Sequence, residues 1–518
     1  MLRRGGSAVD AAIATNAALS VVTSYMCGLG GDAFWLIWDV DAGKVLALNG
    51  SGRSAGGATI DAARSAGLAE MSVRGPWTVT VPGAVDSWRE AHARFGRLAW
   101  ADLLASAIEL ADGFPASATW AETVERAATV FGERSDWART FRPNGRAWRV
   151  GERVALPALA ATLRTLATDG AEAAYSGDLA RRAAAYLRAS GCPLRPEDFA
   201  AHRSDWGAPI STTYRGVTSL SHPPNSCGPI ALETLNILSC FEPPPSGAFD
   251  GRGVNDARWV HLGLEASRLA LADRDAFLTD PEHMPARALE TLLSGEHAAE
   301  LAARLHPDRV LEPEPSSLPR GGGTIALATA DRFGGLVSLI ESNYRGFGSG
   351  LVDPKTGIAY QNRGSFFRLD PEHANALAPG KRTVHTLTPG MLLRDGLPWI
   401  AHASMGGEIQ PQVFAQFVSA VVDGGLDVGT AVAAPRWVTR IGRHLGGPSL
   451  SVLESRYHMA VTQGLRDRGH ELEVVGPWSS EMGHEHAVEI VRGSGDASDG
   501  PTFAAAADPR SEGLPAAW

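Results

Sequence analysis

The chain has 518 residues, of which 44% are hydrophobic and 20% are charged, an ordinary composition for a globular enzyme of one or more domains. Its 47 basic and 57 acidic residues give a net charge of −10, which supplies no counterion-release attraction to phosphates and excludes nucleic acid as an expected partner. No apolar run approaches the roughly 18 residues of a membrane span, and no apolar signal-peptide region follows the basic start at residues 1–6. We therefore expect a cytoplasmic protein that binds no membrane.

The first three hundred residues are mainly helical in pattern. Residues 7–22 are rich in Ala and predict a buried helix, with Ser7 as a suitable N-cap. Residues 33–40 and 44–48 are apolar runs on either side of a turn, which predicts a β-hairpin. Further helical patterns, rich in Ala and Leu, occupy residues 85–113, 154–190, 229–240 and 256–277.

The pattern changes in the second part of the chain. Residues 306–323 are rich in Pro and Gly, which predicts an exposed, extended linker. Strand patterns at 324–330 and 336–342 flank a Gly-containing turn and predict a second hairpin. The remaining expected elements are short strands at 351–360 and 390–403, a helix at 411–423 and a third hairpin at 487–507. This mixed order favours stacked α and β layers.

The sequence predicts no metal and no cofactor. The four cysteines form no CxxC pair, so we expect buried free thiols at Cys27, Cys192, Cys227 and Cys240. Residues 28–31 and 346–350 are rich in Gly, but they have neither a Walker lysine nor the Rossmann spacing, so no nucleotide is assigned to them.

Thr324 stands where the Gly-rich linker meets a strand pattern. A chain cut before Thr324 would carry a hydroxyl and a free α-amine on the same residue. The α-amine titrates near pH 8 (about 7.7–8.0) and can therefore act as general base for its own hydroxyl near neutrality. By itself, a Gly-Gly-Gly-Thr string most often marks a loop that enters a strand.

Seven segments resemble the gamma-glutamyltransferase family, in the order in which that family has them. The segment GGGTIALATADRFGGLVSLIESNYRGFGSG, at residues 321–350, is similar to the family's segment around its catalytic threonine. The other six segments are residues 4–31, 74–88, 221–238, 264–281, 404–412 and 506–513. The resemblance therefore covers nearly the whole chain.

This resemblance implies the family's fold, an α+β four-layer αββα sandwich of N-terminal-nucleophile hydrolases. It also implies a proenzyme that cuts itself between Gly323 and Thr324. Residues 1–323 would then form a large subunit and residues 324–518 a small subunit that begins at the nucleophile. The two subunits would form a heterodimer intertwined in one structural domain, and the family's chemistry needs no metal.

The resemblance also assigns catalytic roles. Thr324 matches the family's nucleophile, whose hydroxyl attacks an amide carbonyl and forms an acyl-enzyme. Gly406 and Gly407 match the family's oxyanion Gly-Gly, where backbone N–H groups stabilise the developing negative charge. Ser342 matches a family threonine that hydrogen-bonds the surroundings of the nucleophile. From the residues alone, a simple turn is the preferred interpretation of Gly406-Gly407, and Ser342 could equally be a solvated strand hydroxyl.

The expected substrate-binding residues depart from the family pattern. Tyr344 stands where the family has an asparagine that holds the glutamyl α-amino group, and Arg363 stands in a stretch that is acidic in the family. His385 and Thr386 replace a Ser-Ser pair that helps to hold the α-carboxylate. Arg53 lies about two positions from the place of the family's carboxylate-binding arginine.

A cation at Arg363 disfavours an α-ammonium group and favours a carboxylate, which arginine can hold with two parallel hydrogen bonds. The alternative for Arg363 is a structural ion pair that faces away from the pocket. The pattern is more similar to the gamma-glutamyltransferase-like branch that includes cephalosporin acylases and oxamate amidohydrolase. The leading hypothesis is an amidohydrolase or acyl transferase that cleaves a small carboxylate-bearing acyl amide. The alternatives are a glutathione hydrolase proper and a non-catalytic remnant that only binds a small molecule.

Overall fold

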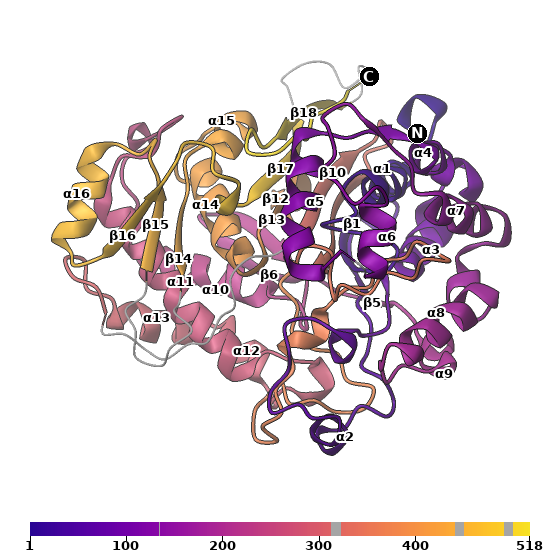
Figure 1. Cartoon of the computed structure of the whole chain (residues 1–518). Coiled ribbons are helices and arrows are strands. Elements are labelled where there is room, and N and C mark those ends of the chain that lie inside the picture. The colour runs from indigo at the N-terminus through magenta and orange to yellow at the C-terminus, as the bar shows by residue number, and fades with distance from the viewer. Residues whose placement is uncertain (134, 312–322, 441–449, 492–500, 518) are drawn as a thin grey trace.

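The computed structural model describes the chain except for residues 134, 312–322, 441–449, 492–500 and 518. Two β-sheets lie face to face, and helices cover the outer face of each sheet (Figure 1). This arrangement confirms the α+β four-layer αββα sandwich expected from the sequence.

The first sheet has the strand order β10-β11-β1-β2-β5, and every neighbouring pair is antiparallel. Its strands are β10 (Gly323–Ala330), β11 (Leu336–Tyr344), β1 (Asp32–Asp39), β2 (Lys44–Gly50) and β5 (Asp205–Gly207). The central strand β1 is buried at every position. Strands from both of the expected subunits therefore share one sheet, in which β10 is an edge strand.

The second sheet has the order β18-β17-β13-β12-β7-β6. Its strands are β6 (Ile210–Tyr214), β7 (Val217–Ser221), β12 (Gly390–Arg394), β13 (Leu397–Met405), β17 (His484–Val491) and β18 (Thr502–Ala507). β10 and β11 of the first sheet pack against β13 of the second. Alternation along β1 sends Phe34 and Leu36 into the layer between the sheets, while Trp35 joins the core beneath the helices.

Helix α1 (Ala8–Val22) packs against the outer face of the first sheet, on β10 and β11. Ser7 caps it as expected: Ser7 Oγ accepts a hydrogen bond from the Asp10 N–H at 3.1 Å, and Asp10 Oδ2 accepts one from the Ser7 N–H at 2.9 Å. The other helices up to residue 201 are α2 (Ile60–Ser65), α3 (Ala84–Phe95), α4 (Trp100–Asp112), α5 (Ala118–Phe131), α6 (Asp136–Phe141), α7 (Pro157–Asp169), α8 (Asp178–Ala189) and α9 (Pro196–Ala201).

Helices α10 (Gly228–Ser239), α11 (Ala257–Phe277) and α14 (Gln410–Val422) form the layer outside the second sheet. Beyond them lies a small sheet of three strands, β14 (Trp437–Arg440), β15 (Leu450–Glu454) and β16 (Glu471–Val475). The remaining elements are α12 (Ala288–Leu292), α13 (Gly295–Arg304), α15 (Val428–Ala433), α16 (Met459–Asp467) and the two-residue pairs β3 (Phe114–Pro115) with β4 (Arg153–Val154) and β8 (Phe249–Asp250) with β9 (Gly253–Val254).

Most expected elements are present, including the helix at 411–423 and the three hairpins, formed by β1 and β2, β10 and β11, and β17 and β18. The strand expected at 351–360 is wrong, because an isolated bridge between Val352 and Ala359 closes a turn there. The expectation of four buried thiols is wrong at Cys240, which is exposed. Residues 312–322 of the expected linker lie outside the described residues.

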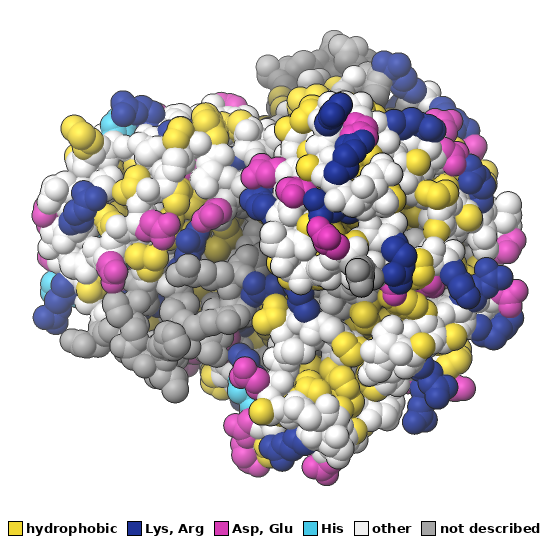
Figure 2. Space-filling view, viewed as in Figure 1, with side chains coloured by type: hydrophobic (Ala, Val, Ile, Leu, Met, Phe, Trp, Pro, Cys, Tyr) yellow, Lys and Arg dark blue, Asp and Glu magenta, His cyan; other side chains and the backbone are white. Residues whose placement is uncertain are grey.

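Among the described residues, no helix combines the length and the apolar character that crossing a membrane requires. On the face shown in Figure 2, basic and acidic side chains are interspersed. The cytoplasmic location and the absence of a nucleic-acid partner stay predictions of the sequence.

The packing of α11 against the small sheet gives a stability prediction. A Cβ at Gly263 would lie 2.4 Å from the Trp437 ring, whereas a Cβ at Gly295, the first residue of α13, would meet nothing within 4 Å. We expect Gly263→Ala to lower the free energy of unfolding by about 1–3 kcal/mol through overpacking, and Gly295→Ala to cost nothing. Urea denaturation of both variants checks this, and equal midpoints would contradict it.

Candidate active site

Thr324 is the second residue of the edge strand β10 and is 1% exposed. It pairs across the sheet with Ser342 of β11, and the register shifts between Gly323 and Thr324. The two hydroxyl oxygens lie 3.0 Å apart. Ser342 donates its proton to the Gly323 carbonyl at 2.7 Å and accepts the Tyr344 N–H at 2.7 Å. Since the single Ser342 proton points to Gly323, Thr324 must be the donor of the Thr324–Ser342 hydrogen bond.

Asp32 continues this polar row on the next strand, because β1 pairs Asp32 with Ser342. Directly paired residues of antiparallel strands project from the same face, so all three side chains face the second sheet. Asp32 Oδ1 accepts hydrogen bonds from the N–H groups of Gly52 and Gly83, at 3.1 and 3.2 Å. Burial raises the pKa of the Asp32 carboxyl to about 7.

Arg363 lies beside this row and is fully buried, at 1% exposure. It begins a short 3-10 helix, η6 (Arg363–Phe366). One guanidinium nitrogen donates to Thr386 Oγ1 at 3.1 Å, and the other lies 3.5 Å from Ser342 Oγ. The guanidinium carbon sits 4.3 Å from the centre of the Tyr344 ring. Burial lowers the pKa of Arg363 to about 10, so the guanidinium remains charged at neutral pH.

No ion pair joins Arg363 to a carboxylate among the described residues. Its side chain does not face away from Thr324, since it shares Ser342 as a neighbour with that residue. A buried cation without an anionic partner is costly unless a ligand supplies the anion.

Gly406 and Gly407 follow the end of β13, and Gly407 begins a second 3-10 helix, η7 (Gly407–Ile409). Gly406 has a φ of 146°, and a Cβ there would lie 2.6 Å from the Ile409 side chain. The N–H groups at the start of a helix have no acceptor inside it and are available to an anion. Gly406 and Thr324 line the same pocket, which Gly407 does not line.

Glu408 also lines this pocket, and the sequence analysis did not single it out. Its carboxylate is ion-paired with buried Arg274 of α11, and the Tyr344 hydroxyl lies 3.5 Å from its other oxygen. Glu408 lies in the family-like segment 404–412 and Arg274 in the segment 264–281, which is the signal that could have found them.

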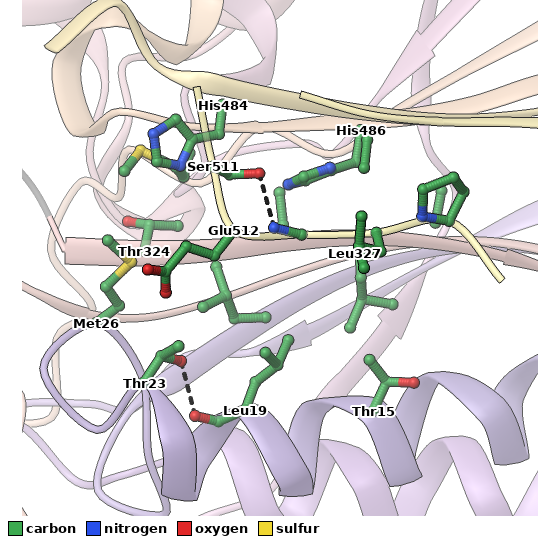
Figure 3. Close-up of a pocket in the computed structure, with 18 of the residues that line it drawn as sticks. Thr15, Leu19, Thr23, Met26, Thr324, Leu327, His484, His486, Ser511 and Glu512 are labelled. Atoms are coloured by element: carbon green, nitrogen blue, oxygen red, sulfur yellow. Dashed lines mark hydrogen bonds between the residues drawn. The ribbon is translucent and has the colours of Figure 1, made fainter. Parts of the chain in front are cut away.

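The pocket is a groove of about 1810 Å³ that follows the whole outer edge of β10, between α1 and the segment after β18. Figure 3 shows Leu19 of α1 and Thr23, which directly follows α1, on one side and His484 of β17 on the other, with Thr324 of β10 between them. The groove is thus an open sheet edge as well as the approach to Thr324. Ser342, Arg363, His385 and Thr386 do not line it and lie on the inner side of Thr324.

Two expected substrate-binding residues have other partners. Arg53 is about one-third exposed and pairs with Asp280 at 3.1 Å, which makes it a surface ion-pair residue rather than part of the group around Thr324. His385 Nε2 lies 3.3 Å from Asp32 Oδ2, and burial lowers the pKa of the imidazole far below its usual range. A neutral His385 therefore supports Asp32 and supplies no charge to a substrate.

This arrangement is that of an amide hydrolase with a nucleophile at the start of a strand in an αββα sandwich. The gamma-glutamyltranspeptidase family model matches residues 1–518, and the chain belongs to that family of autoprocessing N-terminal-nucleophile amide hydrolases. It is therefore an enzyme of this class.

Three of the proteins that this chain is similar to match the branch named in the sequence analysis. A glutathione hydrolase-like YwrD proenzyme of Bacillus subtilis is 39% identical over 95% of this chain and 91% of the relative. The oxamate amidohydrolase proenzyme of Klebsiella pneumoniae is 38% identical over 100% of this chain and 95% of the relative. The cephalosporin acylase of Bacillus halodurans has a similar structure, with a TM-score of 0.89 and 38% identity over 100% of this chain and 92% of that chain.

The buried Asp32 carboxyl predicts a pH dependence of stability. Its folded-state pKa of about 7 exceeds the unfolded value of about 3.9, so the folded state binds the extra proton and loses stability as pH rises between these values. In Asp32→Asn the amide oxygen can accept hydrogen bonds from the same N–H groups, but no proton is bound. We expect the free energy of unfolding to fall less steeply with pH than in the wild type, with the two slopes differing by up to about 1.4 kcal/mol per pH unit. Urea denaturation from pH 4 to 8 tests this, and parallel curves for the two proteins would refute it.

Proposed function

We propose that the chain cuts itself between Gly323 and Thr324 and then uses Thr324 to cleave a small acyl amide that bears a carboxylate. The supporting observation is Arg363, a buried cation without a carboxylate partner among the described residues, one side chain away from Thr324. Residues 1–323 and 324–518 are the proposed large and small subunits, held together because β10 and β11 remain in one sheet with β1.

The first step is the self-cleavage. The Thr324 hydroxyl donates to Ser342, which in turn donates to the Gly323 carbonyl. Thr324 Oγ attacks the Gly323 carbonyl carbon and a C–O bond forms. The C–N bond then breaks, and the proton lost by the Thr324 hydroxyl goes to the departing nitrogen, which becomes the free α-amine. Water then hydrolyses the ester and leaves Gly323 as a carboxylate. Ser342 supports this step because its proton polarises the carbonyl under attack.

The mature reaction repeats this chemistry on a substrate. The freed α-amine takes the proton of the Thr324 hydroxyl, the oxygen attacks the substrate's amide carbon, and the amine leaves with a proton. The N–H groups of Gly406 and Gly407 stabilise the oxyanion, for which a donor is worth roughly 3–4 kcal/mol. Water, or an amine acceptor, then releases the acyl group from Thr324.

The charges around Thr324 support a carboxylate on the acyl side. The guanidinium of Arg363, beside Thr386 and against the Tyr344 ring, can donate hydrogen bonds to this carboxylate. Glu408, one of the acids that line the groove, is ion-paired with Arg274 and is therefore not free to hold a glutamyl α-ammonium. Arg363 lies close to Thr324 through their common neighbour Ser342, which favours a short acyl chain.

The names of the relatives, oxamate amidohydrolase and cephalosporin acylase, agree with hydrolysis of such amides. Glutathione hydrolysis is the competing activity, since one relative is named glutathione hydrolase-like. It requires an α-ammonium to be accommodated near Arg363, which the charge of that residue opposes.

Intact mass spectrometry tests the cleavage. We expect two chains divided between Gly323 and Thr324 for the wild type, a single full-length chain for Thr324→Ala, and cleavage retained in Thr324→Ser because the hydroxyl is kept. A wild-type chain that stays whole after long incubation, or a Thr324→Ala variant cut at the same bond, would disprove self-cleavage by Thr324.

Hydrolysis assays test the role of Arg363. We expect the wild type to cleave the amide bond of short dicarboxylic acid monoamides faster than in the same amides with the free carboxylate converted to a methyl ester. It should also cleave them faster than γ-glutamyl-p-nitroanilide. Arg363→Gln should lower kcat/KM for the monoamides with a free carboxylate by about 10- to 100-fold, which corresponds to the loss of a charge-assisted hydrogen bond of about 1.5–3 kcal/mol. It should leave kcat/KM for the methyl-ester forms of these amides unchanged.

Arg53→Gln is the matched control, because its ion pair lies near the surface. Rates are normalised to the cleaved fraction of each variant, measured by mass spectrometry, so that poor processing is not mistaken for weak binding. A wild type that prefers the γ-glutamyl substrate, or an Arg363→Gln variant that loses both substrates equally, would rule out the proposed carboxylate contact.

A further inference from the structure

A second cluster of ionisable side chains lies in the helical layer outside the second sheet. Glu233 of α10, Asp273 of α11 and His297 of α13 place one ligand atom each within 4.8 Å of one another. His297 Nε2 lies 2.6 Å from Asp273 Oδ2 and 3.3 Å from Glu233 Oε1. The three residues come from three separate helices, so packing of the layer and not local sequence creates the cluster.

Glu233 is the unusual member. Its side chain is 0% exposed, and neither carboxylate oxygen has a hydrogen-bond partner with acceptable geometry among the described residues. The 3.3 Å contact with His297 is therefore an ion-pair distance without the angle of a hydrogen bond. A fully buried carboxylate with no hydrogen bond of its own, placed against two other ligand atoms, favours a bound cation.

The neighbouring arginine, Arg274, does not supply a positive charge to Glu233. Arg274 follows Asp273 on α11, but its guanidinium is ion-paired with Asp275 and Glu408. The nearest imidazole, His297, has its Nε2 hydrogen-bonded to Asp273 at 2.6 Å.

We propose that Glu233, Asp273 and His297 bind one divalent transition-metal ion of the Zn²⁺ or Mn²⁺ type. One imidazole nitrogen with two carboxylate oxygens is a ligand set that these ions accept, whereas Ca²⁺ and Mg²⁺ prefer oxygen ligands alone. Asp273 and His297 are each partly exposed, at 18% and 16% of the side chain, so the ion has a path from solvent. Binding displaces the imidazole proton and neutralises both acids.

The location gives the ion a structural role. It ties together α10, α11 and α13, which otherwise meet through apolar contacts. Asp273 is adjacent to Arg274, whose ion pair with Glu408 anchors the short helix after Gly406. Helix α10 begins directly after Cys227, whose N–H donates to the carbonyl of His385. The ion would therefore brace the layer that supports the candidate active site without touching Thr324.

Calorimetric titration of the full, tag-free chain with ZnCl₂ and with MnCl₂, after dialysis against EDTA, tests the site. We expect one equivalent of at least one of the two ions to bind the wild type, and its Tm to rise with the ion. Glu233→Gln and Asp273→Asn each keep the shape of the side chain and remove one charge, so each should weaken binding at least tenfold and abolish the Tm shift.

Glu296→Gln is the matched control, because it removes an exposed carboxylate from α13, the helix of His297, at the position directly before His297. It should bind the ion as the wild type does. Absence of binding of both ions to the wild type overturns the proposal, and so does equal binding by the wild type and both cluster variants. Two variants are used so that a folding defect in one, seen by circular dichroism, still leaves the other to decide.

Discussion

The antiparallel pairing of β10 with β11 sets Thr324 opposite Ser342, and the chemistry of the site depends on this register. The Ser342 hydroxyl is shared by the Gly323 carbonyl, the Tyr344 N–H and the Thr324 hydroxyl, and it lies beside Arg363. A slip of one residue would turn every β10 side chain to the opposite face of the sheet and remove Thr324 from these contacts. The buried inter-sheet layer fixes the register and therefore the position of Thr324, the proposed nucleophile.

The buried charged side chains near Thr324, Ser342 and Asp32 differ in the partners that they have. Arg274 and Glu408 neutralise each other, and Asp32 is held by backbone N–H groups and a neutral His385. The hydrogen-bond and ring contacts of Arg363 are with hydroxyls and aromatic rings, and no ion pair joins it to a carboxylate among the described residues. Because desolvation of an unpaired charge is costly, this difference supports the proposed role of Arg363 in substrate binding.

The outer edge of β10 forms a groove that extends well beyond Thr324. An edge strand exposes unpaired N–H and C=O groups, and here they line a groove with apolar residues from α1 such as Leu19 and Val22. Thr324 occupies one end of this groove, so only that end is close to the nucleophile. The size of the groove therefore says little about the size of the acyl group, which in the proposed function is limited by the short separation of Arg363 and Thr324.

The sequence by itself determined the layered α+β fold, the hairpins at β1–β2 and β10–β11 and the family, because periodic patterns, turn residues and collinear motifs are local properties of the chain. It did not find the small sheet of β14, β15 and β16, whose short strands give weak local signals. Only the tertiary structure decided which polar groups meet. His385 reaches Asp32 across 353 residues, Arg53 turns to Asp280, and Arg363 turns to Ser342. No local pattern encodes such pairs, because they arise from the burial of charged groups when the layers pack.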